Sequence, residues 1–140
     1  MEDKLIKTVL IVDDNDLLLE ILCEVLAWEG FEVLQASNGR DALEIVSSRN
    51  IDLVISDVQM PNGDGIELMK KIHCLEGHQR PGLILVSGNI GALTFDPTDY
   101  NVLAVSQKPI DYDYLIRTIH NHPYQAFKHP VPPEFILTTG

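Results

Sequence analysis

The chain has 140 residues, of which 45% are hydrophobic, and it carries a formal net charge of -11 at pH 7. This length and apolar content predict a single globular domain and exclude a disordered chain. The excess of acidic residues, 21 Asp and Glu against 10 Lys and Arg, repels phosphate backbones and argues against direct nucleic-acid binding.

The first part of the chain predicts a strand, a helix, a second strand and a second helix. The continuous apolar run at Thr8–Val12 is typical of a strand that is covered on both faces. A helix is expected after Asp16, which would cap it, and before Gly30. Residues 31–36 alternate partly, which favours an edge strand, and Gly39–Ser48 has the period of a second helix. The inward side of the first helix is expected to consist of Leu18, Ile21, Leu22, Val25 and Leu26.

Predicted strands and helices also alternate in the second part of the chain. Continuous apolar runs predict buried strands at residues 53–56, 83–87 and 102–106. A third helix is expected after Asp64, and a last helix over about Tyr112–Asn121. The order predicts an α/β fold with a doubly wound parallel sheet flanked by helices.

Polar residues stand at the carboxyl end of nearly every predicted strand. Right-handed crossovers make these strands parallel, so their carboxyl ends open at one edge of the sheet, where ligands bind. We therefore expect five side chains to converge there, namely those of Asp13, Asp14, Asp57, Ser87 and Lys108.

This set of residues suits phosphoryl chemistry. Three neighbouring carboxylates repel one another unless a cation neutralises them, and magnesium prefers oxygen ligands. Lys108 and Ser87 could hold the oxygens of a group between them, as a phosphoryl group requires. Asp57 could then act as the nucleophile, because the following turn "MPNGDG" bends the chain away from its carboxylate.

At this point the sequence resembles a known family. The stretches "LIVDDN" and "ISDVQMPNGDG", followed by Ser87 and by Lys108-Pro109, resemble the receiver domains of two-component response regulators, including the single-domain chemotaxis regulator. The resemblance covers about residues 8–121. It implies a flavodoxin-like, five-stranded parallel sheet with the strand order 2-1-3-4-5, as in the chemotaxis regulator.

The resemblance also implies roles for the site residues. Asp57 would accept phosphate from a histidine kinase or a histidine phosphotransfer protein, while Ser87 and Lys108 hold the phosphoryl oxygens. Mg²⁺, or alternatively Mn²⁺, would be bound directly by Asp14, Asp57 and the main-chain carbonyl of Gln59, and mostly through water by Asp13. The Lys108-Pro109 bond would be cis. Such a protein is a phosphoacceptor that promotes its own phosphorylation and dephosphorylation, and not an enzyme in the usual sense.

Two features depart from the family pattern. Val105 stands three residues before Lys108, where many members carry the Tyr or Phe whose rotation reports phosphorylation. Residues 88–101 contain two glycines and Pro97, which predicts a loop or a short, irregular helix in place of the usual fourth helix. The output partner is therefore unknown, and a homodimer is one option.

Two alternative functions stay open from the residues. A receiver-like interaction module that does not depend on phosphate would explain Val105 and the irregular segment. A haloacid-dehalogenase-like phosphatase also uses an aspartate nucleophile after a parallel strand, but it needs a second acid two residues later. Gln59 occupies that place here, which disfavours the phosphatase.

The remaining expectations concern the limits and the location of the domain. Residues 1–122 are predicted to form the receiver domain, and residues 123–140 a Pro-rich tail or linker remnant, so that the chain works alone or is a fragment. No stretch approaches the roughly 18 apolar residues of a membrane span, and the N-terminus lacks an export signal. Cys23 and Cys74 lack metal-ligand spacing, so a cytoplasmic protein with reduced thiols and no membrane partner is expected.

Overall fold

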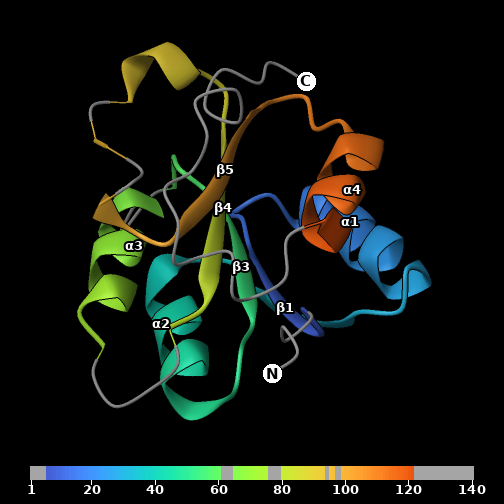
Figure 1. Ribbon diagram of the computed structural model, residues 1–140, viewed down its shortest axis with the longest axis horizontal. Coiled ribbons are helices and arrows are strands. Elements are labelled where there is room, and N and C mark those ends of the chain that lie inside the picture. Colours follow the sequence, from blue (N-terminus) through green and yellow to red (C-terminus); the bar gives the residue numbers. More distant parts are fainter. Residues whose placement is uncertain (1–5, 61–64, 76–79, 94, 97–98, 122–140) are drawn as a thin grey trace.

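The computed structural model describes residues 6–60, 65–75, 80–93, 95–96 and 99–121. Strands and helices alternate through this part of the chain, as predicted (Figure 1). The strands are β1 (Thr8–Val12), β2 (Glu32–Ala36), β3 (Leu53–Asp57), β4 (Gly82–Ser87) and β5 (Val102–Gln107). The helices are α1 (Asp16–Trp28), α2 (Gly39–Ser48), α3 (Gly65–His73) and α4 (Tyr112–Asn121). A 3-10 turn, η1 (Ile90–Ala92), lies between β4 and β5, so the predicted irregular segment is confirmed there.

The five strands form one parallel sheet with the order β2-β1-β3-β4-β5. This confirms the predicted doubly wound topology. The chain leaves β1 toward β2 on one side and later returns to β3 on the other side. The carboxyl ends of β1 and β3 therefore lie at the point where the strand order reverses, which is where such sheets bind ligands.

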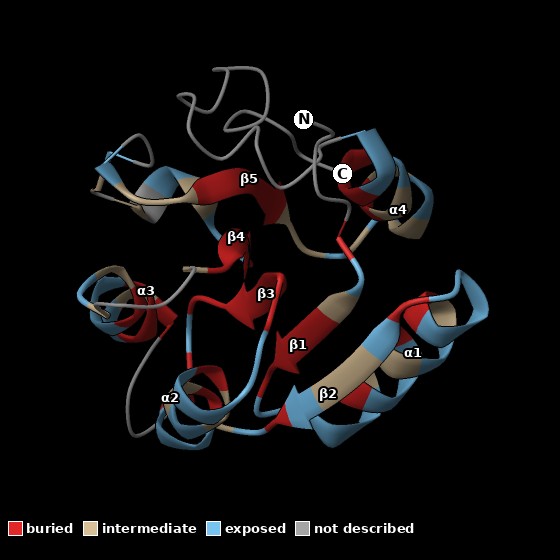
Figure 2. Ribbon diagram, turned by 60° about the horizontal axis from the view of Figure 1, so that its bottom comes forward, coloured by how far each residue is buried: buried red, intermediate tan, exposed pale blue. Residues whose placement is uncertain are grey.

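Helices cover both faces of the sheet, α1 and α4 one face and α2 and α3 the other (Figure 1). Alternate residues of each strand enter two separate hydrophobic cores. For example, Leu10 and Val54 belong to the core with α2 and α3, whereas Ile11 and Ile55 belong to the core with α1 and α4. Every residue of β3 and β4 is buried (Figure 2). This double coverage explains why the strands are continuous apolar runs in the sequence.

Two predictions about α1 were wrong. Its cap is Asn15, whose side-chain oxygen accepts a hydrogen bond from the Leu18 main-chain nitrogen at 3.2 Å, and Asp16 is already the first helical residue. Ile21 does not face inward but is 37% exposed, because the buried stripe of the helix is Leu19, Leu22 and Leu26. Leu22 and Leu26 are buried as predicted, and Leu19 takes the inward place that was expected for Ile21.

The other ends of the helices agree with the sequence where they are described. Asp111 precedes α4, and its side chain accepts a hydrogen bond from the Tyr114 main-chain nitrogen at 3.0 Å. The predicted cap of α3, Asp64, lies outside the described residues, as does the stretch from 122 to 140. The domain limit at 122/123 and the Pro-rich tail therefore stay predictions. Among the described residues, none of the helices is long and apolar enough to cross a membrane.

Candidate functional site

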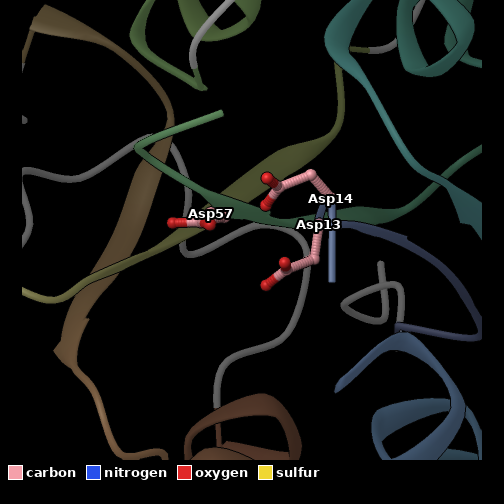
Figure 3. A group of neighbouring side chains, drawn as sticks. All are labelled: Asp13, Asp14 and Asp57. Atoms are coloured by element: carbon pink, nitrogen blue, oxygen red, sulfur yellow. The ribbon is translucent and has the colours of Figure 1, made fainter. Parts of the chain in front are cut away.

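Three carboxylates meet at the carboxyl edge of the sheet. Asp13 and Asp14 follow β1, and Asp57 is the last residue of β3 (Figure 3). Each of the three offers a carboxylate oxygen, and these atoms lie within 4.8 Å of one another. Asp13 and Asp57 are buried, with 3% and 6% of their surface exposed, whereas Asp14 is exposed. The site therefore combines rigidly held acids with an open side toward solvent.

Asp57 is held from both of its carboxylate oxygens. Its Oδ1 accepts a hydrogen bond from the Gln59 main-chain nitrogen at 3.2 Å, and its Oδ2 is 3.2 Å from the ammonium of Lys108. The main chain of Asp57 is also closely approached by Gly65 at the start of α3. A Cβ on Gly65 would overlap the main-chain oxygen of Asp57 and stand 2.9 Å from Cα of Val58. Only glycine allows α3 to begin so near the end of β3.

Lys108 links two of the carboxylates. Its Nζ lies 3.2 Å from Asp57 and 3.6 Å from Oδ2 of Asp13. Burial by itself lowers the pKa of Lys108, but the hydrogen bond to Asp57 and the charges of Asp13 and Asp57 outweigh burial and raise that pKa above its usual value. The Lys108-Pro109 bond is cis, as predicted. Lys108 is thus a fixed positive charge at neutral pH.

The electrostatics of the cluster fit a divalent cation. Burial raises the pKa of Asp13, and the charges of Asp57 and Asp14 raise it further, while the hydrogen bond from the Asn15 main-chain nitrogen at 2.8 Å and the charge of Lys108 lower it. Three carboxylates beside one lysine leave about two uncompensated negative charges. A magnesium ion would neutralise this excess with the oxygen ligands that it prefers.

Ser87 occupies the end of the neighbouring strand. Val86, the residue before it, pairs with Asp57 in the sheet register, and Ser87 itself is fully buried. Its hydroxyl oxygen accepts a hydrogen bond from the Asn89 main-chain nitrogen at 3.0 Å. Its carbonyl accepts one from the Lys108 main-chain nitrogen at 2.8 Å. Ser87 and Lys108 are therefore tied together through the ends of β4 and β5.

The similarity to known proteins agrees with this geometry. A model of the family described as "Response regulator receiver domain" matches residues 9–120 of the chain. The chain is a receiver domain of the two-component response regulators.

Relatives and solved structures place the receiver domain more closely. It is 33% identical to sporulation initiation phosphotransferase F of Bacillus subtilis over 107 residues, which are 76% of this chain and 86% of the relative. It is also 33% identical to the transcriptional regulatory protein GlrR of Escherichia coli over 110 residues, which are 79% of this chain but only 24% of GlrR. The response regulator TrrA of Thermotoga maritima, solved in complex with Mg(2+)-BeF, superposes with a TM-score of 0.71 at 29% identity, covering 82% of this chain and 97% of TrrA.

The structure brings the three predicted acids of the receiver domain within 4.8 Å of one another and places Lys108 against Asp13 and Asp57, while Ser87 stands at the end of the adjoining strand. Val105 is the position at which the sequence departs from the family pattern. It is aliphatic, 1% exposed, and packed in the core beside α2 and α3. An aromatic ring is therefore absent from this position of β5.

Two residues of the receiver domain's site were not predicted. Gly65 admits α3 next to Asp57, and Gln107 binds the turn that follows Ser87. The glycine was visible in "NGDGIEL" as a turn residue, but its close approach to Asp57 depends on the packing of α3. No local signal distinguishes Gln107 from an ordinary polar residue at the end of a strand.

Proposed function

We propose that Asp57 is the phosphoacceptor of this receiver domain. One observation carries the proposal: the Asp57 carboxylate lies at the end of a buried strand, 3.2 Å from Lys108 and beside two further acids. A carboxylate oxygen of Asp57 would attack phosphorus of a phosphohistidine on a histidine kinase or histidine phosphotransfer protein. The P–N bond breaks, its electron pair stays on the imidazole, and an acyl phosphate forms on Asp57.

The neighbouring residues would hold the new group. Lys108 and the Ser87 hydroxyl are the donors at the adjacent strand ends, and phosphoryl transfer depends chiefly on positioning and on neutralising the phosphoryl oxygens. A hydroxyl that accepts a hydrogen bond at its oxygen can still donate its proton. Ser87 can therefore keep its bond from Asn89 while it donates to a phosphoryl oxygen.

A magnesium ion belongs to the same proposal. Asp14, Asp57 and the Gln59 main-chain carbonyl would bind it directly, and Asp13 mostly through water, with Mn²⁺ as an alternative ion. When bound, the ion supplies positive charge to the phosphoryl oxygens. The clustered carboxylates support this role, and so does the relative whose solved complex contains Mg(2+)-BeF.

The test is phosphorylation by a small donor. The chain is incubated with acetyl phosphate and Mg²⁺, and the intact mass is measured. We expect one phosphate on the wild type, none on Asp57→Asn and none when the metal is chelated. Absence of the adduct on the wild type, or its presence on Asp57→Asn, would contradict the assignment. The promotion of its own dephosphorylation is tested by following loss of the adduct after the donor is removed.

A second candidate is an interaction module that does not depend on phosphate. Val105 favours it, because a buried valine cannot rotate outward as an aromatic ring could. Beryllofluoride with Mg²⁺ mimics the phosphorylated state, and amide exchange of β4, β5 and η1 with and without it separates the two candidates. Unchanged exchange would favour the independent module. The phosphatase is not proposed, because Gln59 provides no acid two residues after Asp57.

The proposed location is the cytoplasm. Both cysteines are free, which is compatible with a reducing cytoplasm, where histidine kinases present their phosphohistidine. Sedimentation of the chain with and without phosphodonor tests whether it forms a homodimer, which was one option for its assembly.

A further inference from the structure

The side chain of Gln107 forms two hydrogen bonds to the turn that follows Ser87. Gln107 is the last residue of β5 and pairs with Ser87 in the sheet register. Its Nε2 donates to the Gly88 carbonyl at 2.9 Å, and its Oε1 accepts from the Ile90 main-chain nitrogen at 3.3 Å. The half-buried glutamine therefore holds both ends of the turn that contains Asn89.

Only a carboxamide of this length can make both bonds. One planar group must donate to a carbonyl and accept from an N–H group, and among side chains only Asn and Gln offer both functions in this form. The two partners also fix which end of the amide is oxygen, since a carbonyl requires a donor and an N–H group requires an acceptor. The match to Gly88 and Ile90 is thus specific to glutamine.

The turn that Gln107 holds controls the hydroxyl of Ser87. The Asn89 main-chain nitrogen, in the middle of the turn, donates to the Ser87 hydroxyl oxygen at 3.0 Å. That bond orients the hydroxyl, and its direction depends on where the turn places Asn89. On the other side, Gln107 is joined by a peptide bond to Lys108, whose ammonium contacts Asp57. Gln107 therefore connects the two phosphoryl-binding donors.

We propose that Gln107 is a positioning residue for phosphoryl transfer: it holds the Ser87–Ile90 turn so that the Ser87 hydroxyl and Lys108 keep their places at the edge of the sheet. This inference rests on the proposed phosphorylation of Asp57. It also gives the chain a connection between the site and η1 that does not use the position of Val105. Ile90, the acceptor's partner, is the first residue of η1 and packs against the core that contains Val105.

The kinetic test is a double-mutant cycle between Gln107 and Ser87. Gln107→Met keeps the length of the side chain and removes both hydrogen bonds. We expect it to slow phosphorylation by acetyl phosphate roughly tenfold, as small displacements of positioned groups do. The Mg²⁺ affinity, measured by calorimetry, should not change, because none of the proposed ligands contacts Gln107. The double variant with Ser87→Ala should be no slower than Ser87→Ala alone.

The matched control is Gln35→Met, which makes the same substitution at an exposed glutamine of the edge strand β2. It should react at the wild-type rate. A wild-type rate for Gln107→Met would overturn the inference, and so would a double variant slowed by the product of the two single effects. If Gln107→Met does not fold, Gln107→Glu enters the same cycle, because it keeps the acceptor for Ile90 and loses the donor for Gly88.

A structural measurement tests the inference independently of phosphorylation. In the metal-free protein, Gln107→Met should speed hydrogen exchange of the Ile90 and Asn89 amides roughly tenfold, because local opening of the turn becomes easier. Unchanged exchange at both amides would overturn the positioning role. If the wild type takes up no phosphate, the proposed function fails while this measurement still decides whether Gln107 holds the turn.

Discussion

Two aspartates stand at opposite ends of strand β3, and they are equally buried but differ in the charged groups around them. Asp52 precedes the strand and Asp57 ends it, with 5% and 6% of their surfaces exposed. Oδ2 of Asp52 accepts hydrogen bonds from the main-chain nitrogens of Lys7 and Thr8, both at 2.9 Å. Asp57 also accepts one main-chain hydrogen bond, from Gln59, but its other oxygen contacts the side chain of Lys108, and two other carboxylates stand beside it.

Burial alone therefore does not mark a functional acid. The two main-chain donors to Asp52 come from Lys7 and Thr8, at the start of β1, and they satisfy the carboxylate within the fold. The neighbours of Asp57 are charged side chains at an open edge, where an ion or a phosphoryl group can enter. Asp52 therefore has a structural role before β3, whereas Asp57 lies at a site that a ligand can reach at the end of β3.

Replacing each of the two acids by asparagine should have the largest and most different effects. Asp57→Asn should lose all phosphorylation, because an amide is not a nucleophile toward phosphorus, whereas Asp52→Asn should still take up one phosphate. Intact mass after treatment with acetyl phosphate and Mg²⁺ measures both. Comparable loss in the two variants would mean that the chemistry is not localised at the carboxyl end of β3.

The converse effect should appear in stability. Asp52→Ala removes the acceptor of two main-chain N–H groups and should lower the free energy of unfolding by about 3 kcal/mol. Asp57→Ala removes one of three mutually repelling carboxylates and should change it by less than about 1 kcal/mol. Urea unfolding of the metal-free variants measures the difference, and equal losses would contradict it.

Gly65 allows α3 to begin close to the main chain of Asp57. Gly65→Ala forces a methyl group against the main chain of Asp57 and should cost about 2 kcal/mol, the usual range for overpacking. Gly88→Ala is the matched control, since a Cβ there meets no atom within 4 Å, and its unfolding free energy should stay within about 0.5 kcal/mol of the wild type. Thermal and urea unfolding decide between these outcomes.

The smallest expected effect concerns Asp13. Its raised pKa means that the ionised carboxylate destabilises the fold at neutral pH, and that this penalty fades as the pH falls through the raised pKa toward the ordinary value of 3.8. Asp13→Asn keeps an oxygen for the Asn15 N–H group and should gain less than about 1 kcal/mol at pH 7 without metal. The gain should shrink as the pH falls and vanish below pH 3.8.

Adding Mg²⁺ provides the control for Asp13. The ion should stabilise the wild type more than Asp13→Asn, because a carboxylate contributes more to a cation site than an amide does. Melting temperatures at both pH values, with and without the ion, test this. A loss of stability in the metal-free Asp13→Asn variant at pH 7 would contradict the prediction that the ionised Asp13 carboxylate destabilises the fold.

Local sequence patterns were sufficient to predict the secondary structure, because a strand that is buried on both faces appears in the sequence as a continuous apolar run. The run at Thr8–Val12 matched β1 at both ends, and the glycine-interrupted segment after β4 contains η1. The prediction of α1 was less accurate. Asn15 and Asp16 are both good caps, and only the main-chain conformation at Asn15, with φ -92 and ψ 108, decides between them.

The order of strands and helices, and the edge at which Asp13, Asp14 and Asp57 stand, follow from the sequence alone, because right-handed crossovers force parallel strands to end on the same side. The tertiary structure alone decided which groups touch. Lys108 reaches Asp57 across 51 residues of chain, and Gln107 reaches Gly88 across 19. Asp52 and Asp57 look alike in the sequence because both are single acids beside the same apolar run. Packing of the strands gives Asp52 two main-chain donors and brings a lysine and two further acids to Asp57, and these neighbours distinguish the structural acid from the proposed phosphoacceptor.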